Sequence, residues 1–151
     1  MKSLVPILGG SLCLAGCERG PAEPRVAVEN AVVTVPAVPG GAGAAYFTIT
    51  TNNDPSRLVS ITSPSIGSIE LHHSRQAAGV SSMAPLQPGD ASFDPEIPLS
   101  FAPGGKHAML IGMDPALRPG SRVTLTFHVE PAAPVTVEAE VRGPGQVHAG
   151  H

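Results

Sequence analysis

At 151 residues, the chain is long enough for one domain with a hydrophobic core and too short for two domains of ordinary size. Only 14% of its residues are charged, the formal net charge is −3, and no cluster of Lys and Arg could neutralise nucleic-acid phosphates. Four Phe, one Tyr and no Trp leave few rings that could stack on bases or sugars. The composition therefore argues against nucleic-acid binding and favours one domain whose core is made of Val, Ile, Leu, Ala and Met.

Residues 1–17 have the organisation of an export signal. Lys2 precedes an apolar run about as long as the hydrophobic region of a signal peptide, and small residues follow before Cys17. The sequence LAGC at 14–17 resembles a bacterial lipobox, in which the cysteine is acylated and becomes the first mature residue. We therefore expect a lipoprotein-type signal peptide at residues 1–16 and a lipid on Cys17. An ordinary signal peptide, cleaved nearby and leaving a free thiol, is the alternative.

Residues 17–24 continue as a polar, Pro-rich segment that suits a tether between a lipid and a domain. This organisation predicts a periplasmic protein anchored to a membrane, and Glu18, where an Asp would favour the inner membrane, favours the outer membrane. Cys13 would leave with the signal and Cys17 would carry the lipid, so the mature domain has neither a free thiol nor a disulfide. Blue-copper centres and cysteine zinc sites are thereby excluded, because both need thiolates.

Short segments of alternating apolar residues, separated by Gly and Pro, make up the rest of the chain. No stretch has a sustained helical period, and the predicted strands are 26–35, 44–51, 58–62, 68–74, 97–101, 107–112, 122–129 and 135–141. About eight short strands in one domain, residues 25–142, predict an all-β fold, an antiparallel sandwich or barrel. Residues 143–151 are predicted to be a flexible tail that contains His148 and His151.

Two His and two Met residues are the candidate metal ligands. His107 and Met109 are separated by one residue in a predicted strand, so both side chains leave the same face, with Cα atoms about 6.5 to 7 Å apart. His72 lies near the end of another predicted strand, and Met83 follows a loop that contains Gly79. Imidazole and thioether together form a soft ligand set that favours Cu(I). The alternative is that the methionines fill the core and the histidines are structural or solvated.

The run His72-x10-Met83-x23-His107-x-Met109 resembles the copper-binding signature of the periplasmic copper-A chaperone family, also called PCuAC or DUF461. The resemblance extends over residues 25–140, with blocks in the family's order at 30–71, 83–86 (MAPL), 101–113 (FAPGGKHAMLIGM) and 117–127 (LRPGSRVTLTF). The chain departs from the family in the longer interval before His107 and in Ser74, which stands where many members have a Met. One auxiliary ligand is therefore missing.

The resemblance implies a cupredoxin-like β-sandwich that binds one Cu(I) per monomer through His72, Met83, His107 and Met109. It also implies delivery of the ion to a copper-accepting protein, either a cytochrome c oxidase subunit or its assembly factor. No catalytic motif is present, so we expect no enzymatic activity. His148 and His151 could capture Cu(II) as auxiliary ligands, because imidazole suits that ion. Two other functions remain open: a copper-sequestering, stress-buffering lipoprotein and a structural β-sandwich without metal.

Overall fold

The computed structural model describes residues 25–148. The predicted signal peptide (1–16), the tether with Cys17 (17–24) and His151 lie outside the described residues, and the side chain of His148 is not described either. Within the described range, no helix is long and apolar enough to cross a membrane.

The described residues form an all-β domain, as the sequence predicts, with two single-turn 3-10 helices, η1 (Pro88–Ala91) and η2 (Gln146–His148). The ten strands are β1 (Val26–Thr34), β2 (Gly43–Thr51), β3 (Ser56–Thr62), β4 (Ile66–Ala77), β5 (Val80–Pro85), β6 (Ser92–Phe93), β7 (Leu99–Phe101), β8 (Lys106–Met113), β9 (Arg122–Glu130) and β10 (Val135–Arg142). The expected number of about eight strands was too low, because β5 and β6 were missed. Every residue of β5 is exposed and β6 has only two residues, so neither has the alternating apolar pattern of a half-buried strand.

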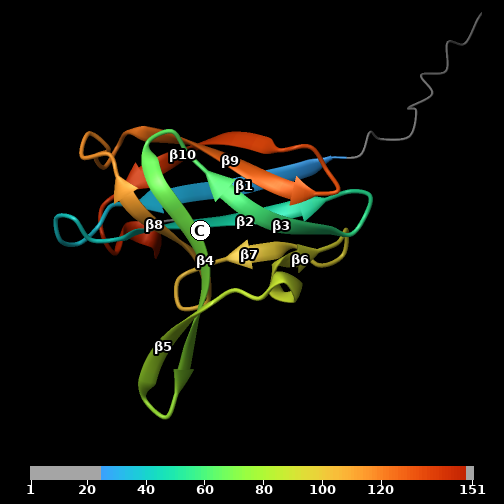
Figure 1. Cartoon of the computed structure of the whole chain (residues 1–151), viewed down its shortest axis with the longest axis horizontal. Coiled ribbons are helices and arrows are strands. Elements are labelled where there is room, and N and C mark those ends of the chain that lie inside the picture. The colour runs from blue at the N-terminus through green and yellow to red at the C-terminus, as the bar shows by residue number, and fades with distance from the viewer. Residues whose placement is uncertain (1–24, 149–151) are drawn as a thin grey trace, which may run out of the picture.

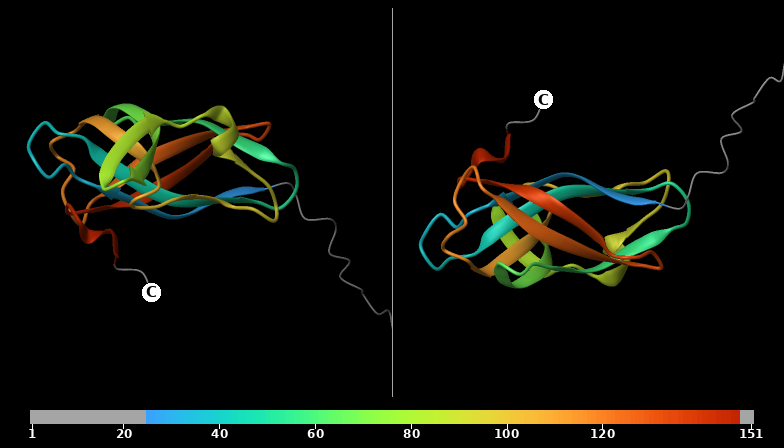
Figure 2. Two further views of the ribbon diagram at one scale, coloured as in Figure 1. Left: turned by 90° about the horizontal axis from the view of Figure 1, so that it is seen from below. Right: turned by 90° about the horizontal axis from the view of Figure 1, so that it is seen from above.

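The strands pair in the order β5-β4-β8-β2-β1-β10-β9-β3-β6. Strand β7 lies outside this order and pairs with residues 47–49 of β2, next to the segment 43–45 that pairs with β8. Every pairing is antiparallel except the parallel one between β1 and β10. The sheet curls back on itself as a β-sandwich (Figures 1 and 2). This architecture places β4, β5 and β8 together at one end of the strand order.

The core is built from alternating strand residues that point inward. In β9, Leu125 and Phe127 are fully buried, and in β2 Phe47 is nearly so. The ring of Phe47 stacks on Phe101 of β7 at 4.4 Å and meets the edge of Phe127 at 4.8 Å between ring centroids. Because these contacts join β2 and β7 to β9, they close the sandwich and leave the outward faces of the strands for polar and functional side chains.

The β4–β5 hairpin extends away from the body of the sandwich (Figure 1). Its two-residue turn consists of Ala78 and Gly79, both with positive φ (52° and 76°), and Ala77 pairs directly with Val80. Positive φ at both central positions suits the tight connection of a two-residue hairpin. Met83 therefore lies in a strand that begins directly after this turn, next to β4.

Gly43 provides a test of the contact between β1, β2 and β8. It pairs with Leu110, and a Cβ atom added to it would lie 2.5 Å from the carbonyl oxygen of Thr34 and would collide with Sδ of Met113. We expect Gly43→Ala to lower the free energy of unfolding by about 1–3 kcal/mol through overpacking. Gly89→Ala is the matched control, since no heavy atom lies within 4 Å of its Cβ position. Chemical denaturation of both variants measures the difference, and equal stability would contradict this packing.

Candidate metal centre

The antiparallel register of β4 and β8 brings the two candidate histidines together. His72 pairs directly with His107, and the next pair on the same face is Glu70 with Met109. Residues directly opposite each other on neighbouring antiparallel strands project from the same side of a sheet, and so do residues two apart along a strand. All four side chains therefore lie on one face of the sheet.

Strand β5 adds the fourth candidate ligand to this face. Met83 pairs with Ser74, which is two residues beyond His72 on β4. The row that contains Ser74 and Met83 thus lies on one side of the histidine pair, and the row that contains Met109 lies on the other side. Successive rows on one face are about 7 Å apart, a distance that a long, flexible thioether side chain can span.

The two imidazole rings are close enough to share one ion. Their centroids are 5.9 Å apart and their planes are nearly perpendicular, at 89°. Bonds from a metal to imidazole nitrogen are about 2 Å long, so a single ion on the line where the two ring planes cross can reach both rings. His72 and His107 are thus brought into one site by strands that are far apart in the sequence.

The ring of His107 is held by a backbone carbonyl and a serine hydroxyl. His107 is only 9% exposed, and its Nδ1 lies 3.3 Å from the carbonyl oxygen of Gly105 and 3.4 Å from Oγ of Ser74. A carbonyl oxygen only accepts hydrogen bonds, so this contact favours a proton on Nδ1 and a free electron pair on Nε2. The hydroxyl of Ser74 therefore contacts a candidate ligand.

His72 has one occupied and one unpaired ring nitrogen. Its Nε2 lies 3.2 Å from Oε2 of Glu70, and its side chain is 13% exposed. Its Nδ1 is buried and has no hydrogen-bond partner among the described residues. A buried polar atom without a partner costs free energy, and native structures contain few of them. Since a metal ion would satisfy this nitrogen, the residues present fit a metal-binding site.

Exposure differs sharply between the imidazoles and one of the thioethers. Met83 is 62% exposed on the projecting β4–β5 hairpin, whereas Met109 is partly buried on β8. In the part of the chain that the structure describes, no three side chains of His, Cys, Asp or Glu form a metal-binding cluster. The candidate ligands that share this face are two adjacent imidazoles with a thioether row on each side, which is a soft ligand set.

Strand β8 has its orientation fixed by the core. Ala108 and Leu110 are completely buried, so their neighbours His107 and Met109 must point outward. Gly112 has φ of 67°, and the following Met113 packs against the hydrophobic core. Met113 therefore belongs to the core and lies apart from the candidate ligands.

Comparisons with known proteins identify the family. The model of the LpqE-like lipoprotein family matches residues 26–141, most of the chain. The chain belongs to the LpqE-like family, which is the PCuAC (DUF461) family of the sequence resemblance. The uncharacterized protein RP573 of Rickettsia prowazekii (strain Madrid E) is 37% identical over 87 residues, which cover 56% of this chain and 46% of RP573. The match thus spans less than half of that relative.

Solved structures of PCuAC domains have the same cupredoxin-like fold. The copper-bound PCuAC domain from PmoF2 is 22% identical, with a TM-score of 0.59, and the match covers 79% of this chain and 93% of that domain. The solution structure of CuI-DR1885 from Deinococcus radiodurans is 28% identical, with a TM-score of 0.52, and the match covers 85% and 83% of the two chains. The fold predicted for this LpqE-like chain is confirmed.

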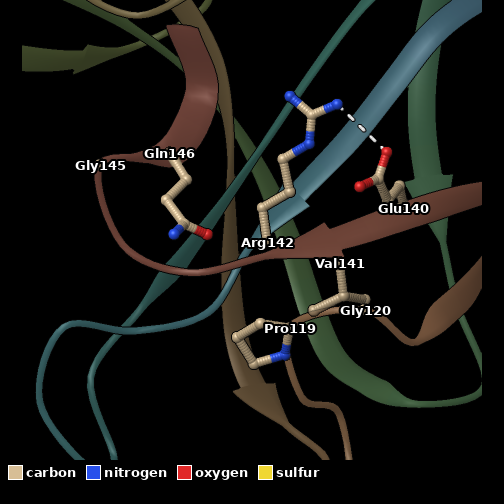
Figure 3. Close-up of a pocket in the computed structure, with 7 residues that line it drawn as sticks. All are labelled: Pro119, Gly120, Glu140, Val141, Arg142, Gly145 and Gln146. Atoms are coloured by element: carbon tan, nitrogen blue, oxygen red, sulfur yellow. Dashed lines mark hydrogen bonds and ion pairs between the residues drawn. The ribbon is translucent and has the colours of Figure 1, made fainter. Parts of the chain in front are cut away.

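A surface pocket near the C-terminal end contains none of the four candidate ligands (Figure 3). Its wall includes Pro119, Gln146 and an ion pair in which Nη2 of Arg142 lies 3.1 Å from Oε2 of Glu140. The hydrogen bond and the positive charge of Arg142 lower the pKa of the Glu140 carboxyl. The candidate ligands of this family member therefore lie on an open sheet face instead of in this pocket.

Contacts around the histidines include residues that the sequence did not single out as functional. Glu70 contacts His72, and the carbonyl oxygen of Gly105 contacts His107. The sequence offers a signal only for Glu70, which lies two residues before His72 in a predicted strand and so shares its face. His148 ends η2, and its predicted role with His151 as an auxiliary Cu(II) site stays a prediction.

The unpaired nitrogen of His72 has a consequence for stability. His72→Leu removes a buried polar atom without a partner, so we expect the metal-free protein to keep its free energy of unfolding or to gain up to about 1 kcal/mol. His107→Leu removes a buried and hydrogen-bonded ring, so we expect a loss of about 1 kcal/mol or more. Urea denaturation of the two metal-free variants measures the difference. Equal losses would contradict the unpaired state of His72.

Proposed function

We propose that this LpqE-like protein is a copper chaperone that binds one Cu(I) through His72, Met83, His107 and Met109 and passes it to another protein. The observation that carries the proposal is the pairing of His72 with His107 on one sheet face, with a buried imidazole nitrogen that lacks a partner. The ion is cargo, and no catalytic step is assigned to the protein.

The chemistry of the ligand set supports Cu(I) over other ions. Two imidazoles and two thioethers carry no negative charge, and soft thioethers favour Cu(I) over Zn(II), Mg(II) or Ca(II). Similar solved structures include a copper-bound PCuAC domain and a Cu(I) form of DR1885, which agrees with this choice of metal.

The unequal exposure of the ligands supports transfer over storage. Met83 is mostly exposed on a projecting hairpin, so a ligand of an acceptor protein can reach the ion from that side and replace the Met83 thioether first. His72 and His107, which are mostly buried, hold the ion until the exchange is completed. A sequestering protein would instead enclose all four ligands.

The finer parts of the proposal concern location and acceptor. An acylated Cys17 would anchor the protein in the periplasm, at the outer membrane, which agrees with its membership of a lipoprotein family. The acceptor is the copper centre of cytochrome c oxidase or an assembly factor for that centre. His148 and His151 would serve as an auxiliary site for Cu(II).

Met109→Leu tests the ligand set. The swap nearly conserves volume, so we expect an intact fold and a Cu(I) affinity at least about tenfold lower, because one of four ligands is lost. Met113→Leu is the matched control, since it makes the same change on the same strand at a residue that packs in the core. Affinity is measured by competition with a chromophoric Cu(I) chelator, and X-ray absorption reports nitrogen and sulfur ligation.

Equal affinities of the Met109→Leu and Met113→Leu variants would contradict the ligand assignment. Binding that disappears when residues 143–151 are removed would assign the metal to the tail instead of the sheet face. Mixing the copper-loaded protein with the copper-binding domain of an oxidase subunit tests delivery. Retention of the ion under conditions in which that domain alone takes up free Cu(I) would favour sequestration.

A further inference from the structure

Glu70 provides a charged contact to His72 in the candidate centre. The two residues are two apart on β4 and point to the same face, and Oε2 of Glu70 lies 3.2 Å from Nε2 of His72. The Glu70 side chain is about half exposed, whereas that of His72 is mostly buried. The carboxylate therefore contacts Nε2 of a mostly shielded ring.

A carboxylate is negatively charged and can only accept hydrogen bonds, so it favours a proton on the nearer nitrogen of a neutral imidazole. The nitrogen of His72 that faces Glu70 is Nε2, and a proton there leaves the electron pair that binds a metal on Nδ1. That nitrogen is the buried one without a partner among residues 25–148. Two independent observations, the carboxylate contact and the unpaired atom, thus select the same nitrogen of His72 for the metal.

The ring of His107 contacts its oxygen acceptor through the other nitrogen, Nδ1. Nδ1 of His107 lies 3.3 Å from the carbonyl oxygen of Gly105, which also only accepts, so the electron pair of that ring resides on Nε2. The partner of the nitrogen that does not bind the metal sets ring orientation and raises ligand basicity in many metal sites. The two rings of this site therefore present different nitrogens.

We propose that Glu70 is a positioning residue that directs His72 to bind Cu(I) through Nδ1, while His107 binds through Nε2. This inference rests on the proposed function, since it concerns the same ion. The carboxylate also places a negative charge beside a site whose four ligands are neutral. Glu70 thus fixes the tautomer of one ligand and partly balances the charge of the cargo.

Nitrogen-15 NMR of the imidazoles tests the assignment, because Cu(I) is diamagnetic and long-range couplings separate Nδ1 from Nε2. In the metal-free protein we expect His72 to be protonated at Nε2 and His107 at Nδ1. After addition of one equivalent of Cu(I), the metal should shift Nδ1 of His72 and Nε2 of His107. Copper at Nε2 of His72, or a metal-free His72 protonated at Nδ1, would overturn the proposal.

Variants of Glu70 supply the second readout. We expect Glu70→Ala to lower Cu(I) affinity by about 10-fold to 100-fold and to mix the His72 tautomers, as loss of such a partner does in other metal sites. Glu70→Gln keeps the shape of the side chain and one accepting oxygen but removes the negative charge. It should therefore lose less affinity than Glu70→Ala. Glu29→Ala is the matched control, since Glu29 is an exposed glutamate on β1.

The outcomes separate this proposal from the function on which it rests. An unmodified protein that does not bind Cu(I) would overturn both. Normal binding by the unmodified protein, with equal affinity in the Glu70→Ala and Glu29→Ala variants, would overturn the role of Glu70 and leave the copper site standing.

Discussion

The register between β4 and β8 is the constraint on which the candidate centre depends. It pairs His72 with His107, and a slip of one residue would turn His107 and Met109 toward the core. The other face of β8 prevents that slip, because Ala108 and Leu110 are completely buried. Close packing of the sandwich interior thus fixes the positions of the candidate ligands on the other face of β8, although neither Ala108 nor Leu110 is itself a candidate ligand.

The same sheet provides rigidity and access at different places. The histidines lie where β4 is paired on both sides, between β5 and β8, and they are mostly shielded. Met83 lies on β5, which is at the end of the strand order and carries only exposed residues. Backbone segments with few buried contacts open at low free-energy cost. Under the proposed function, the ion would be held where β4 pairs with β8 and exchanged at the neighbouring strand β5.

Sequence patterns predict the parts of this arrangement that depend on local geometry. Alternation correctly located most strands, and the spacing of His107 and Met109 placed both on one face. The pairing of His72 with His107 depends on contacts between distant strands, and periodicity carries no information about which strands are neighbours. The hairpin strand with Met83 was missed because it has no buried face. Glu70 and Gly105 were missed since their roles depend on side-chain and carbonyl orientations.

The unpaired nitrogen of His72 would link the stability of the fold to the proposed cargo. In the metal-free protein this buried atom lowers stability, because folding removes it from water without giving it a partner. A ligand that binds only the folded state stabilises it by an amount that grows with ligand concentration over the dissociation constant. An ion bound at this nitrogen therefore adds its binding free energy and removes a defect of the apo state. The strands that create the defect are held by the core, so under the proposed function the site would stay preformed after an ion is released.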